Sequence, residues 1–276
     1  MNAAEIQRAA RTELDGLATA LSNAGVSVHV FDDTPEPVKP DAVFPNNWFS
    51  THADGVVVLY PMLAPNRRLE RRLDIVAALH SRNGFHVHDT IDLTHRELDA
   101  KYLEGTGSLV LDRIHRIAYA CLSPRTDLDV LGEFRQRLDY EIAAFDAADA
   151  NGAPIYHTNV LMSVGTKWAA VCTQAIEQGR RAAIVALLES TGHDIIELTL
   201  EQMHSFAGNM LELRTRDGGL VIAMSKTALD SLAQEQRTKL ESHATIVSAP
   251  IPTIERLGGG SVRCMIAEVH LPRDGR

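Results

Sequence analysis

The stretch SLVLDRIHRIAYACLSPRTDLDVLGEFRQRLDYEIAAF, residues 108–145, decides the fold. Two short apolar runs, at 108–112 and 116–121, predict a pair of strands separated by a tight turn. Thr126 then precedes a run with helical periodicity, so a helix is expected over 127–145. The unit is therefore a strand hairpin followed by a helix.

The same order of elements returns along the chain at a spacing of roughly 50 residues. Further strands are predicted at 26–31, 56–62, 85–88, 159–164, 168–173, 194–199, 209–214, 220–225, 245–250 and 263–271, and further helices at 5–23, 66–83, 177–190 and 226–242. Such repeats are typical of propellers and stacked arrays, whereas a doubly wound parallel sheet has more helices and fewer hairpins. No proline- or serine-rich linker divides the chain. We therefore expect one α/β domain over residues 1–276.

The composition excludes several classes of protein. With 36 Asp+Glu against 27 Lys+Arg, the formal net charge is −9, which disfavours nucleic acid as a partner. No apolar run reaches the roughly 20 residues that span a bilayer, and the N-terminal residues lack the apolar stretch of a secretory signal. The cysteines at positions 121, 172 and 264 are too few and too far apart for a disulfide framework. A cytoplasmic protein without membrane contact is predicted.

Cys264 is the cysteine whose surroundings suggest chemistry. It follows Gly-Gly-Gly-Ser-Val-Arg (258–263), and loops held by a rigid scaffold often carry reactive groups. A neighbouring guanidinium, Arg263, favours the nucleophilic thiolate, although many free cysteines are only small buried hydrophobes. The glycines do not form a phosphate-binding loop, because the Lys-Ser/Thr pair and the following helix are missing. Cys121 and Cys172 lie in apolar strand patterns and are expected in the core.

A histidine and an acid are candidate partners for this thiol. His157, in Tyr-His-Thr-Asn (156–159), is an imidazole able to move protons near neutral pH, but it is one of 12 histidines. Glu104, in Leu-Glu-Gly-Thr-Gly-Ser (103–108), precedes glycines that let a ligand approach the backbone, and a solvated loop acid is the alternative. The alternating pair His86 and His88 lacks further ligands at metal-binding spacing, so no metal is predicted.

Amide side chains form a second group of candidates. Asn46 and Asn47 stand beside Trp48 in Phe-Pro-Asn-Asn-Trp (44–48), and polar groups in an apolar wall are typical of small-molecule sites. The alternative is a turn in which these amides bond to nearby backbone. Asn209, in Phe-Ala-Gly-Asn-Met (206–210), is open to either interpretation.

Taken together, four of these segments resemble the guanidine-modifying enzyme superfamily. They are EGTGS (104–108), YHTN (156–159), AGNML (207–211) and GGGSVRCM (258–265), in that order. The superfamily includes arginine deiminases, dimethylarginine hydrolases, agmatine deiminases, amidinotransferases and dihydrolases, and the resemblance extends over about residues 41–272. Within it, FPNNWFSTH, LEGTGSLVLDR, SPRT and YHTNVLMSVG are most similar to the amidinotransferase-like citrulline utilisation hydrolases.

The resemblance implies a fold and a mechanism. The fold is the pentein, an α/β propeller of five ββαβ units about a pseudo-fivefold axis, which agrees with the repeat described above. Cys264 would attack the central carbon of a guanidino or ureido group and form a covalent intermediate. His157 would protonate the leaving nitrogen and then activate water, while Glu104 would hold the substrate nitrogens and orient the imidazole. No organic cofactor is implied, because the thiol supplies the nucleophile.

Two amides distinguish this sequence from the deiminases of the superfamily. Asn47 and Asn159 stand where the deiminases carry carboxylates that balance a guanidinium. An amide both donates and accepts, so it suits a neutral ureido group as well as a cation. The same amides occur in arginine dihydrolases, so hydrolysis down to ornithine, ammonia and carbon dioxide is expected.

Other features of the resemblance concern the ends of the substrate and of the chain. Arg125 and Arg263 are candidates for binding the substrate α-carboxylate, with a strand-end ion pair as the alternative for Arg125. Family members usually begin with a further strand and an Asn-rich loop, so the first repeat is expected to be incomplete.

Other functions stay open. One is a deiminase that makes citrulline from arginine or a modified arginine, and another is a pentein module that binds a partner without catalysis. The retained Cys264, His157 and Glu104 favour an enzyme over a binding module. An amidinotransferase would need an acceptor-amine site that the sequence does not reveal. The expected partner is a small amino acid, citrulline or arginine, and the sequence leaves open whether the chain forms a homo-oligomer.

Overall fold

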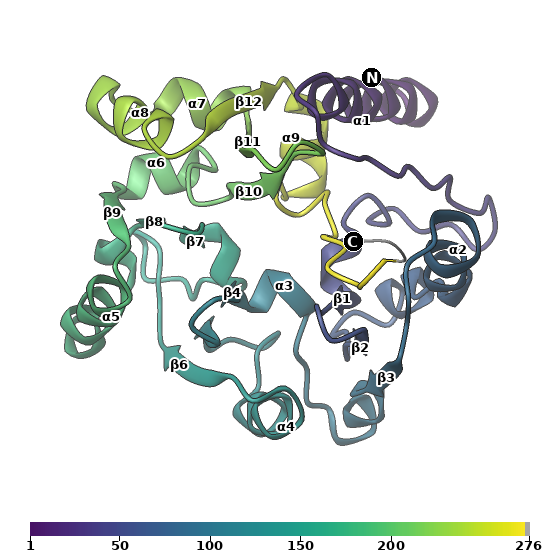
Figure 1. The fold of residues 1–276 in the computed structure, drawn as a ribbon, viewed down its shortest axis with the longest axis horizontal. Helices are drawn as coiled ribbons and strands as arrows, with labels where there is room; N and C mark the ends of the chain where they lie inside the picture. The colour runs from purple at the N-terminus through teal and green to yellow at the C-terminus, as the bar shows by residue number, and fades with distance from the viewer. Residues whose placement is uncertain (274–276) are drawn as a thin grey trace.

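The computed structural model describes residues 1–273 and contains four three-stranded sheets arranged around a central axis (Figure 1). The strands of the four sheets, in chain order, are β1 (Phe49–Thr51), β2 (Val56–Leu59) and β3 (Asp89–Asp92); β4 (Val110–Asp112), β5 (Ile117–Cys121) and β6 (Glu141–Phe145); β7 (Met162–Val164), β8 (Trp168–Val171) and β9 (Asp194–Glu197); and β10 (Leu211–Arg214), β11 (Leu220–Ser225) and β12 (Thr245–Ala249). The first strand of each sheet lies nearest the axis (Figure 1).

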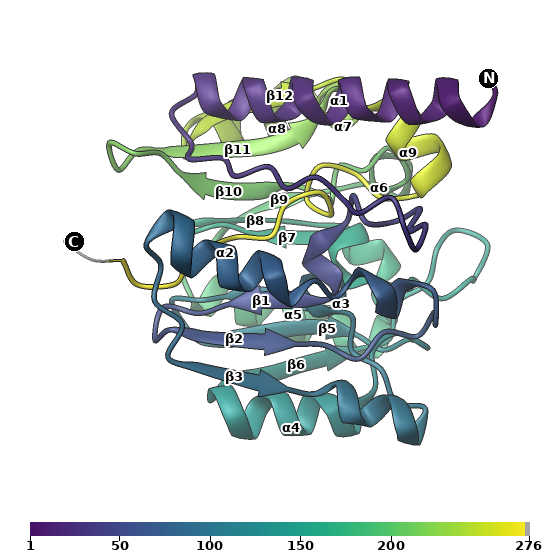
Figure 2. The same cartoon turned by 90° about the vertical axis from the view of Figure 1, so that its right-hand side faces the viewer.

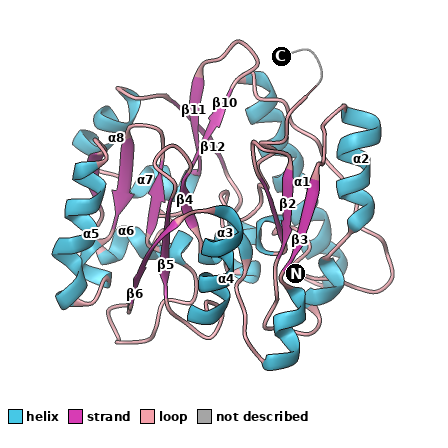
Figure 3. Cartoon of the chain, turned by 60° about the horizontal axis from the view of Figure 1, so that its bottom comes forward, coloured by secondary structure: helices cyan, strands magenta, loops and turns pink. Residues whose placement is uncertain are grey.

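Each sheet repeats one topology. Its first two strands pair antiparallel, and its second pairs parallel with its third. Because a parallel pair needs a crossover, a helical segment precedes every third strand. These segments are α2 (Leu73–Asn83), α4 (Leu128–Leu138), α5 (Gln178–Ser190), and the pair α7 (Lys226–Ser231) and α8 (Gln234–Glu241). In Figures 2 and 3 the helices lie on the outside of the sheets. The predicted ββαβ repeat is confirmed in these four units.

The second unit corrects the prediction of one long helix over 127–145. Helix α4 begins after Asp127, whose side chain accepts from the backbone N–H of Asp129 and Val130, so Asp127 and not Thr126 is the N-cap. The helix ends at Asp139, a residue with φ 54°, in the left-handed region. The chain then forms β6, which pairs parallel with β5. A helical hydrophobic pattern therefore concealed a short buried strand.

The predicted strands at 26–31, 85–88 and 263–271 are wrong: within residues 1–273 none of the three is part of a sheet. The third strand of the first sheet is instead β3, immediately after 85–88. The C-terminal segment runs beside β1, where the Thr51 side chain donates to the Glu268 carbonyl at 2.9 Å and accepts from the His270 N–H at 2.7 Å. Side-chain hydrogen bonds there take the place of a strand ladder.

A fifth sheet is therefore absent from the part of the chain that the structure describes. Its place beside β12 is taken by α1 (Ala3–Asn23), which packs against β12 and α9 (Pro252–Gly258) (Figures 1 and 2). Helix α1 carries a capping box formed by Asn2 and Glu5, which explains why it begins where it does. It buries Leu17 and Leu21 in the same apolar cluster as Cys264.

Some elements had no clear sequence signal. Strand β1, strand β6 and the short helices α3 (Gly105–Ser108), α6 (Leu200–His204) and α9 were not predicted. Most of them are only one or two turns, or a few residues, long, so periodicity has too few positions to act on. Over residues 1–273, the helices are all too short or too polar to span a lipid bilayer.

A partly buried ion cluster lies at the central axis. The Glu268 carboxylate is 2.9 Å from the Arg263 guanidinium and 3.8 Å from that of Arg113, and it lines a small cavity with residues of β4, β7 and β10. Burial by itself raises the pKa of Glu268, but the two guanidinium groups outweigh it and hold this pKa well below its usual range. The carboxylate is therefore anionic in the folded protein.

Glu268→Gln is expected to lower the free energy of unfolding by about 3 kcal/mol at pH 7, because it leaves two guanidinium groups facing each other. Since the folded-state pKa lies below the unfolded value, this stabilisation is present above about pH 4.5 and is lost as the pH falls further. Urea unfolding at pH 7 and pH 4 measures the effect. A difference between wild type and variant that does not shrink at pH 4 would contradict the charge explanation.

Candidate active site

Cys264 reaches the centre of the molecule through a loop that follows α9. The loop begins at Gly259, whose φ of 70° ends the helix in the left-handed conformation. At Gly260, an added Cβ would come 2.8 Å from the Phe44 ring and 3.2 Å from the Cβ of Cys264. A residue without a side chain is therefore required for the loop to pack this closely. Ser261 fixes the loop further by donating to Glu255 in α9 at 2.8 Å.

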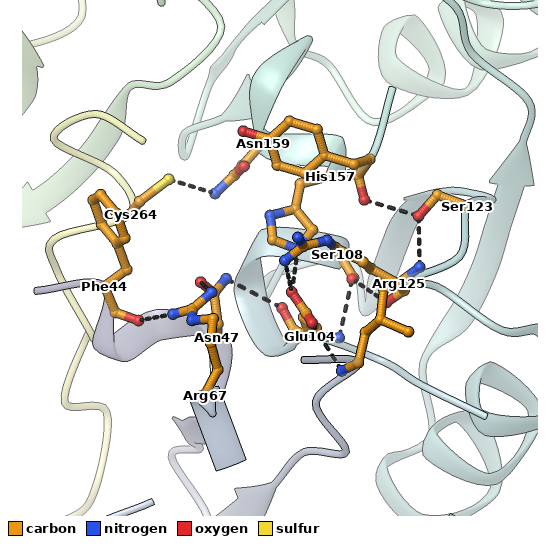
Figure 4. A network of polar contacts seen from close by, with 12 residues as sticks. Phe44, Asn47, Arg67, Glu104, Ser108, Ser123, Arg125, His157, Asn159 and Cys264 are labelled. Atoms are coloured by element: carbon orange, nitrogen blue, oxygen red, sulfur yellow. Dashed lines mark hydrogen bonds and ion pairs between the residues drawn. The ribbon is translucent and has the colours of Figure 1, made fainter. Parts of the chain in front are cut away.

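Two amide groups point at the sulfur of Cys264. The Nδ2 of Asn159 lies 3.4 Å from Sγ, and the Nδ2 of Asn209 lies 3.3 Å from it (Figure 4 shows the first of these contacts). Asn209 is held in turn, because it donates to the Asn159 carbonyl at 2.9 Å and accepts from the Arg263 backbone N–H at 3.0 Å. N–H donors aimed at a sulfur stabilise negative charge on it.

His157 and Glu104 form a buried dyad beside this thiol. The Nε2 of His157 lies 2.8 Å from Oε2 of Glu104, which also accepts from Arg125 at 2.9 Å. Burial by itself raises the pKa of Glu104, but the His157 hydrogen bond and the Arg125 charge outweigh it and hold the pKa below its usual range. Burial lowers the pKa of His157, and the hydrogen bond with Glu104 opposes this shift only in part. A neutral imidazole donating Nε2–H to a carboxylate follows, so Nδ1 carries the lone pair.

Glycine brings the dyad and an amide together. Gly107 lies in α3, the short helix that begins directly after Glu104. An added Cβ at Gly107 would come 2.3 Å from Nδ2 of Asn47 and 2.9 Å from Nδ1 of His157. Asn47 and His157 therefore lie against the same face of α3, and Figure 4 shows them with Cys264 around one shared space. Their close approach requires glycine at this position.

Gly107→Ala is expected to lower kcat/KM by about 100-fold or more, since a displacement of about 1 Å in a site can have an effect of this size. Gly132→Ala is the matched control, because a Cβ at Gly132 in α4 would meet nothing within 4 Å. Steady-state kinetics and thermal melting of both variants provide the measurement. Equal activity in the two variants would show that the close approach of Asn47 and His157 to Gly107 is not needed for catalysis.

The structure brings most of the predicted site residues together. Hydrogen bonds link Cys264 with Asn159 and Asn209, and a further one links His157 with Glu104; Figure 4 shows Cys264 and Asn159 near the His157–Glu104 pair. Asn47 joins them through its contact with the Glu104 carbonyl at 3.5 Å, and Arg125 joins them as the ion-pair partner of Glu104.

Several amide atoms in this region have no protein partner. Both polar atoms of Asn46 and the Oδ1 of Asn159 are buried without a hydrogen bond to any residue in the described part of the chain. Buried polar groups are rarely left unsatisfied in native proteins. Unpartnered amide atoms in segments that carry site residues are consistent with groups that a bound molecule satisfies.

Arg263 lies apart from the site. Its guanidinium pairs with Glu268 at 2.9 Å and donates to the Ile266 carbonyl at 3.2 Å, so it belongs to the ion cluster at the axis. Only its backbone N–H contributes to the site, through Asn209. The guanidinium that was expected to favour the thiolate is therefore occupied elsewhere, and amide donors occupy the space around the sulfur.

Arg67 is a site residue that sequence reasoning missed. It is buried, donates to Oδ1 of Asn47 at 2.9 Å and pairs with Glu70 at 2.8 Å. It also donates to the carbonyl of Phe44 at 3.4 Å (Figure 4). Arg67 thereby fixes which end of the Asn47 amide points toward Glu104. In the sequence, Arg67 belongs to the basic run Asn-Arg-Arg-Leu-Glu-Arg-Arg (66–72). Such a composition is typical of a solvent-exposed helix surface, so nothing in it distinguishes Arg67.

Comparison with known proteins identifies the family. The model for the family described as "N,N dimethylarginine dimethylhydrolase, eukaryotic" matches residues 1–271. The chain belongs to this family. The dimethylarginine dimethylhydrolase family is part of the pentein guanidine-modifying superfamily, which confirms the resemblance described from the sequence. Among curated proteins, no match was found.

Solved structures share the fold of this family member. ArgZ, an arginine dihydrolase from the ornithine-ammonia cycle in cyanobacteria, superposes with a TM-score of 0.73 at 20% identity, over 96% of this chain and 38% of that protein. A ternary complex of AgrE with ornithine and NAD⁺ gives 0.72 at 21% identity, over 96% and 35% of the two chains. A dimethylarginine dimethylaminohydrolase adduct gives 0.64 at 13% identity, over 93% and 89%. The chain thus spans well under half of the length of the first two proteins.

Proposed function

We propose that this chain is a cysteine hydrolase that cleaves carbon–nitrogen bonds in the guanidino group of arginine or the ureido group of citrulline, giving ornithine, ammonia and carbon dioxide. This proposal rests on one observation. Cys264, whose sulfur faces two amide donors, and the His157–Glu104 dyad lie around the same space (Figure 4). A nucleophile, a proton carrier and an orienting carboxylate are the parts that covalent hydrolysis needs.

In the proposed reaction, the Cys264 sulfur attacks the central planar carbon of the substrate. The Nδ1 of His157 takes up the thiol proton of Cys264 as the sulfur attacks, and His157 then delivers this proton to a terminal nitrogen, whose bond to the carbon breaks so that it leaves as ammonia. His157 then removes a proton from water, which attacks the covalent adduct and releases the thiolate. Arginine with one water gives citrulline and ammonia, and citrulline with a second water gives ornithine, ammonia and carbon dioxide.

The amides around the dyad support reaction beyond citrulline. Asn47 and Asn159 carry no charge, so among residues 1–273 Glu104 is the one anion in contact with His157 and Arg125. A neutral ureido group would lose less on entering such a site than on entering one with three carboxylates. The fold is also shared with ArgZ, described as an arginine dihydrolase.

For the α-carboxylate of the substrate, we propose Arg125. Its side chain is 30% exposed, and one nitrogen pairs with Glu104, so the guanidinium keeps N–H groups that this ion pair does not use. A guanidinium fork matches a carboxylate in geometry and charge.

A second candidate substrate is dimethylarginine. The family model that matches residues 1–271 carries this name, and cleavage by the same steps would release dimethylamine and leave citrulline. This reaction is a deimination of a modified arginine and would stop after one round.

Product identification decides between these functions. The purified protein is incubated separately with arginine, citrulline and asymmetric dimethylarginine, and the amino-acid and amine products are identified by mass spectrometry. Ornithine from arginine and from citrulline is expected. Citrulline accumulating from dimethylarginine, with no ornithine from any substrate, would overturn the first proposal in favour of the second, and a folded protein that converts none of the three would overturn both.

A further inference from the structure

A cluster of one carboxylate and two imidazoles lies outside the active site. Among the residues that the structure describes, Asp112, His115 and His193 form one group whose potential ligand atoms all lie within 4.8 Å of one another. Asp112 ends β4, His115 lies in the turn between β4 and β5, and His193 directly precedes β9. Strand β4 lies between α3 and the turn along the chain, and the contacts of the cluster given below involve neither Cys264 nor the His157–Glu104 dyad.

The two oxygens of Asp112 have different surroundings. Oδ1 accepts from the backbone N–H groups of Ile114 and His115, at 3.1 and 3.0 Å, and so holds the β-turn. Oδ2 faces both imidazoles, at 2.8 Å from Nδ1 of His115 and 3.8 Å from Nε2 of His193. The second distance is too long for a hydrogen bond. Oδ2 of Asp112 therefore faces two imidazoles. It hydrogen-bonds to that of His115, whereas that of His193 is too distant to bond to it directly.

A neighbouring hydroxyl orients the buried imidazole. Thr191 Oγ1 lies 2.8 Å from Nδ1 of His193 and also contacts the carbonyls of Leu187 and Leu188, at 3.1 and 2.9 Å. With the proton of His193 on Nδ1, the hydroxyl donates to a carbonyl and its oxygen accepts from Nδ1–H. In that tautomer Nε2 carries the lone pair and faces Asp112, whereas with the proton on Nε2 it donates to the Gly165 carbonyl at 3.2 Å. Metal-bound histidines typically have such a partner on the other ring nitrogen.

We propose that Asp112, His115 and His193 form a binding site for a divalent transition-metal ion of the zinc type. Zinc is bound by imidazole nitrogen and carboxylate oxygen at about 2.0–2.2 Å, which places tetrahedral ligands about 3.4 Å apart. The observed distances of 2.8 and 3.8 Å lie on either side of this value. Mg²⁺ and Ca²⁺ are excluded as the natural ion, because they prefer oxygen ligands alone.

The exposure of the three residues fits this site. Asp112 and His193 are buried, whereas the side chain of His115 is 37% exposed and has room to turn. The ion enters from the side of His115, and water completes its coordination. The Gly165 carbonyl, 3.2 Å from Nε2 of His193, accepts from Nε2–H in the tautomer that carries this proton, and a bound ion would take the place of the proton.

Such an ion would join two units of the propeller. Asp112 and His115 belong to the second sheet and its turn, and His193 to the loop that begins the last strand of the third. A ligand that binds only the folded state stabilises it by mass action, so zinc is expected to raise the melting temperature. This inference is independent of the proposed hydrolase function.

The test is a calorimetric titration of the full chain with Zn²⁺. It is carried out on Cys264→Ser protein, because the active-site thiol would itself bind zinc. One zinc ion per chain and no detectable Mg²⁺ binding are expected, together with a higher melting temperature in zinc. His115→Ala added to this protein is expected to weaken zinc binding at least tenfold.

His95→Ala is the matched control. His95 is an exposed histidine whose Nε2 lies 3.6 Å from a carboxylate oxygen of Glu133, so it offers a single imidazole–carboxylate pair. Its replacement is expected to leave zinc affinity unchanged. Absence of zinc binding to the Cys264→Ser protein, or equal affinity after His115→Ala and His95→Ala, would overturn the proposal.

A second variant protects the test against misfolding. Asp112→Asn keeps an oxygen for the turn N–H groups and removes the negative charge. It is expected to weaken zinc binding as His115→Ala does, and to abolish the visible absorption of Co²⁺ bound in place of zinc. Unchanged zinc binding and an unchanged cobalt spectrum in a folded Asp112→Asn protein would equally overturn the proposal.

Discussion

Cys264→Ala is expected to lower kcat by on the order of 10⁴-fold or more, because it removes the sulfur on which the covalent intermediate forms. Binding should survive, since the amides of Asn159 and Asn209 and the dyad are untouched by the change. The measurement is product formation under saturating substrate, with ligand affinity determined by calorimetry. Loss of turnover with retained affinity identifies Cys264 as the nucleophile.

The other two cysteines are the controls for this prediction. Burial raises the pKa of Cys121 to about 12 and also raises that of Cys172, so both thiols are protonated at neutral pH. Cys172→Ala should therefore keep full turnover, and mass spectrometry after brief treatment with iodoacetamide should find the label on Cys264. Turnover that persists in Cys264→Ala would contradict the proposed mechanism.

Glu104→Gln is expected to lower kcat by about 10³-fold, because a carboxylate that orients an imidazole cannot be replaced by an amide without changing the tautomer. Oε1 of Glu104 accepts from the Leu63 N–H at 3.0 Å, and Oε2 accepts from His157 and Arg125. A glutamine that keeps the Leu63 contact would point its NH₂ group at these two donors. His157 would then lose its partner or turn its lone pair toward the glutamine.

The charge of Glu104 also adds a pH-dependent contribution to stability. Its folded-state pKa lies below the unfolded value, so the contribution is present above about pH 4.5 and is lost as the pH falls below it. Wild type and Glu104→Gln should therefore differ more in melting temperature at pH 7 than at pH 3. Glu133→Gln is the control for kinetics, because Glu133 pairs with Arg96 away from the dyad. Equal kcat in Glu104→Gln and Glu133→Gln would exclude the orienting role.

The sequence by itself determined the repeat and most of the residues that meet in the candidate site. Alternating apolar runs and helix caps are local signals, so most central hairpins and crossover helices were predicted correctly from residues close together in the chain. The order of the four motifs that contain Glu104, His157, Asn209 and Cys264 was sufficient for the resemblance to the pentein superfamily, which the family match confirms. Local signals failed where an element was short, as at β6 after Asp139.

The tertiary structure alone decided which charged and polar groups meet. The guanidinium of Arg125 pairs with Glu104, and that of Arg263 pairs with Glu268. Arg67, from the basic run at 66–72, donates a hydrogen bond to Asn47. None of these pairings follows from spacing, because the partners come from different units and are brought together by the packing of sheets around the axis. A side chain's partner depends on the direction in which its backbone enters the core, and this direction is set by contacts between residues far apart in the chain.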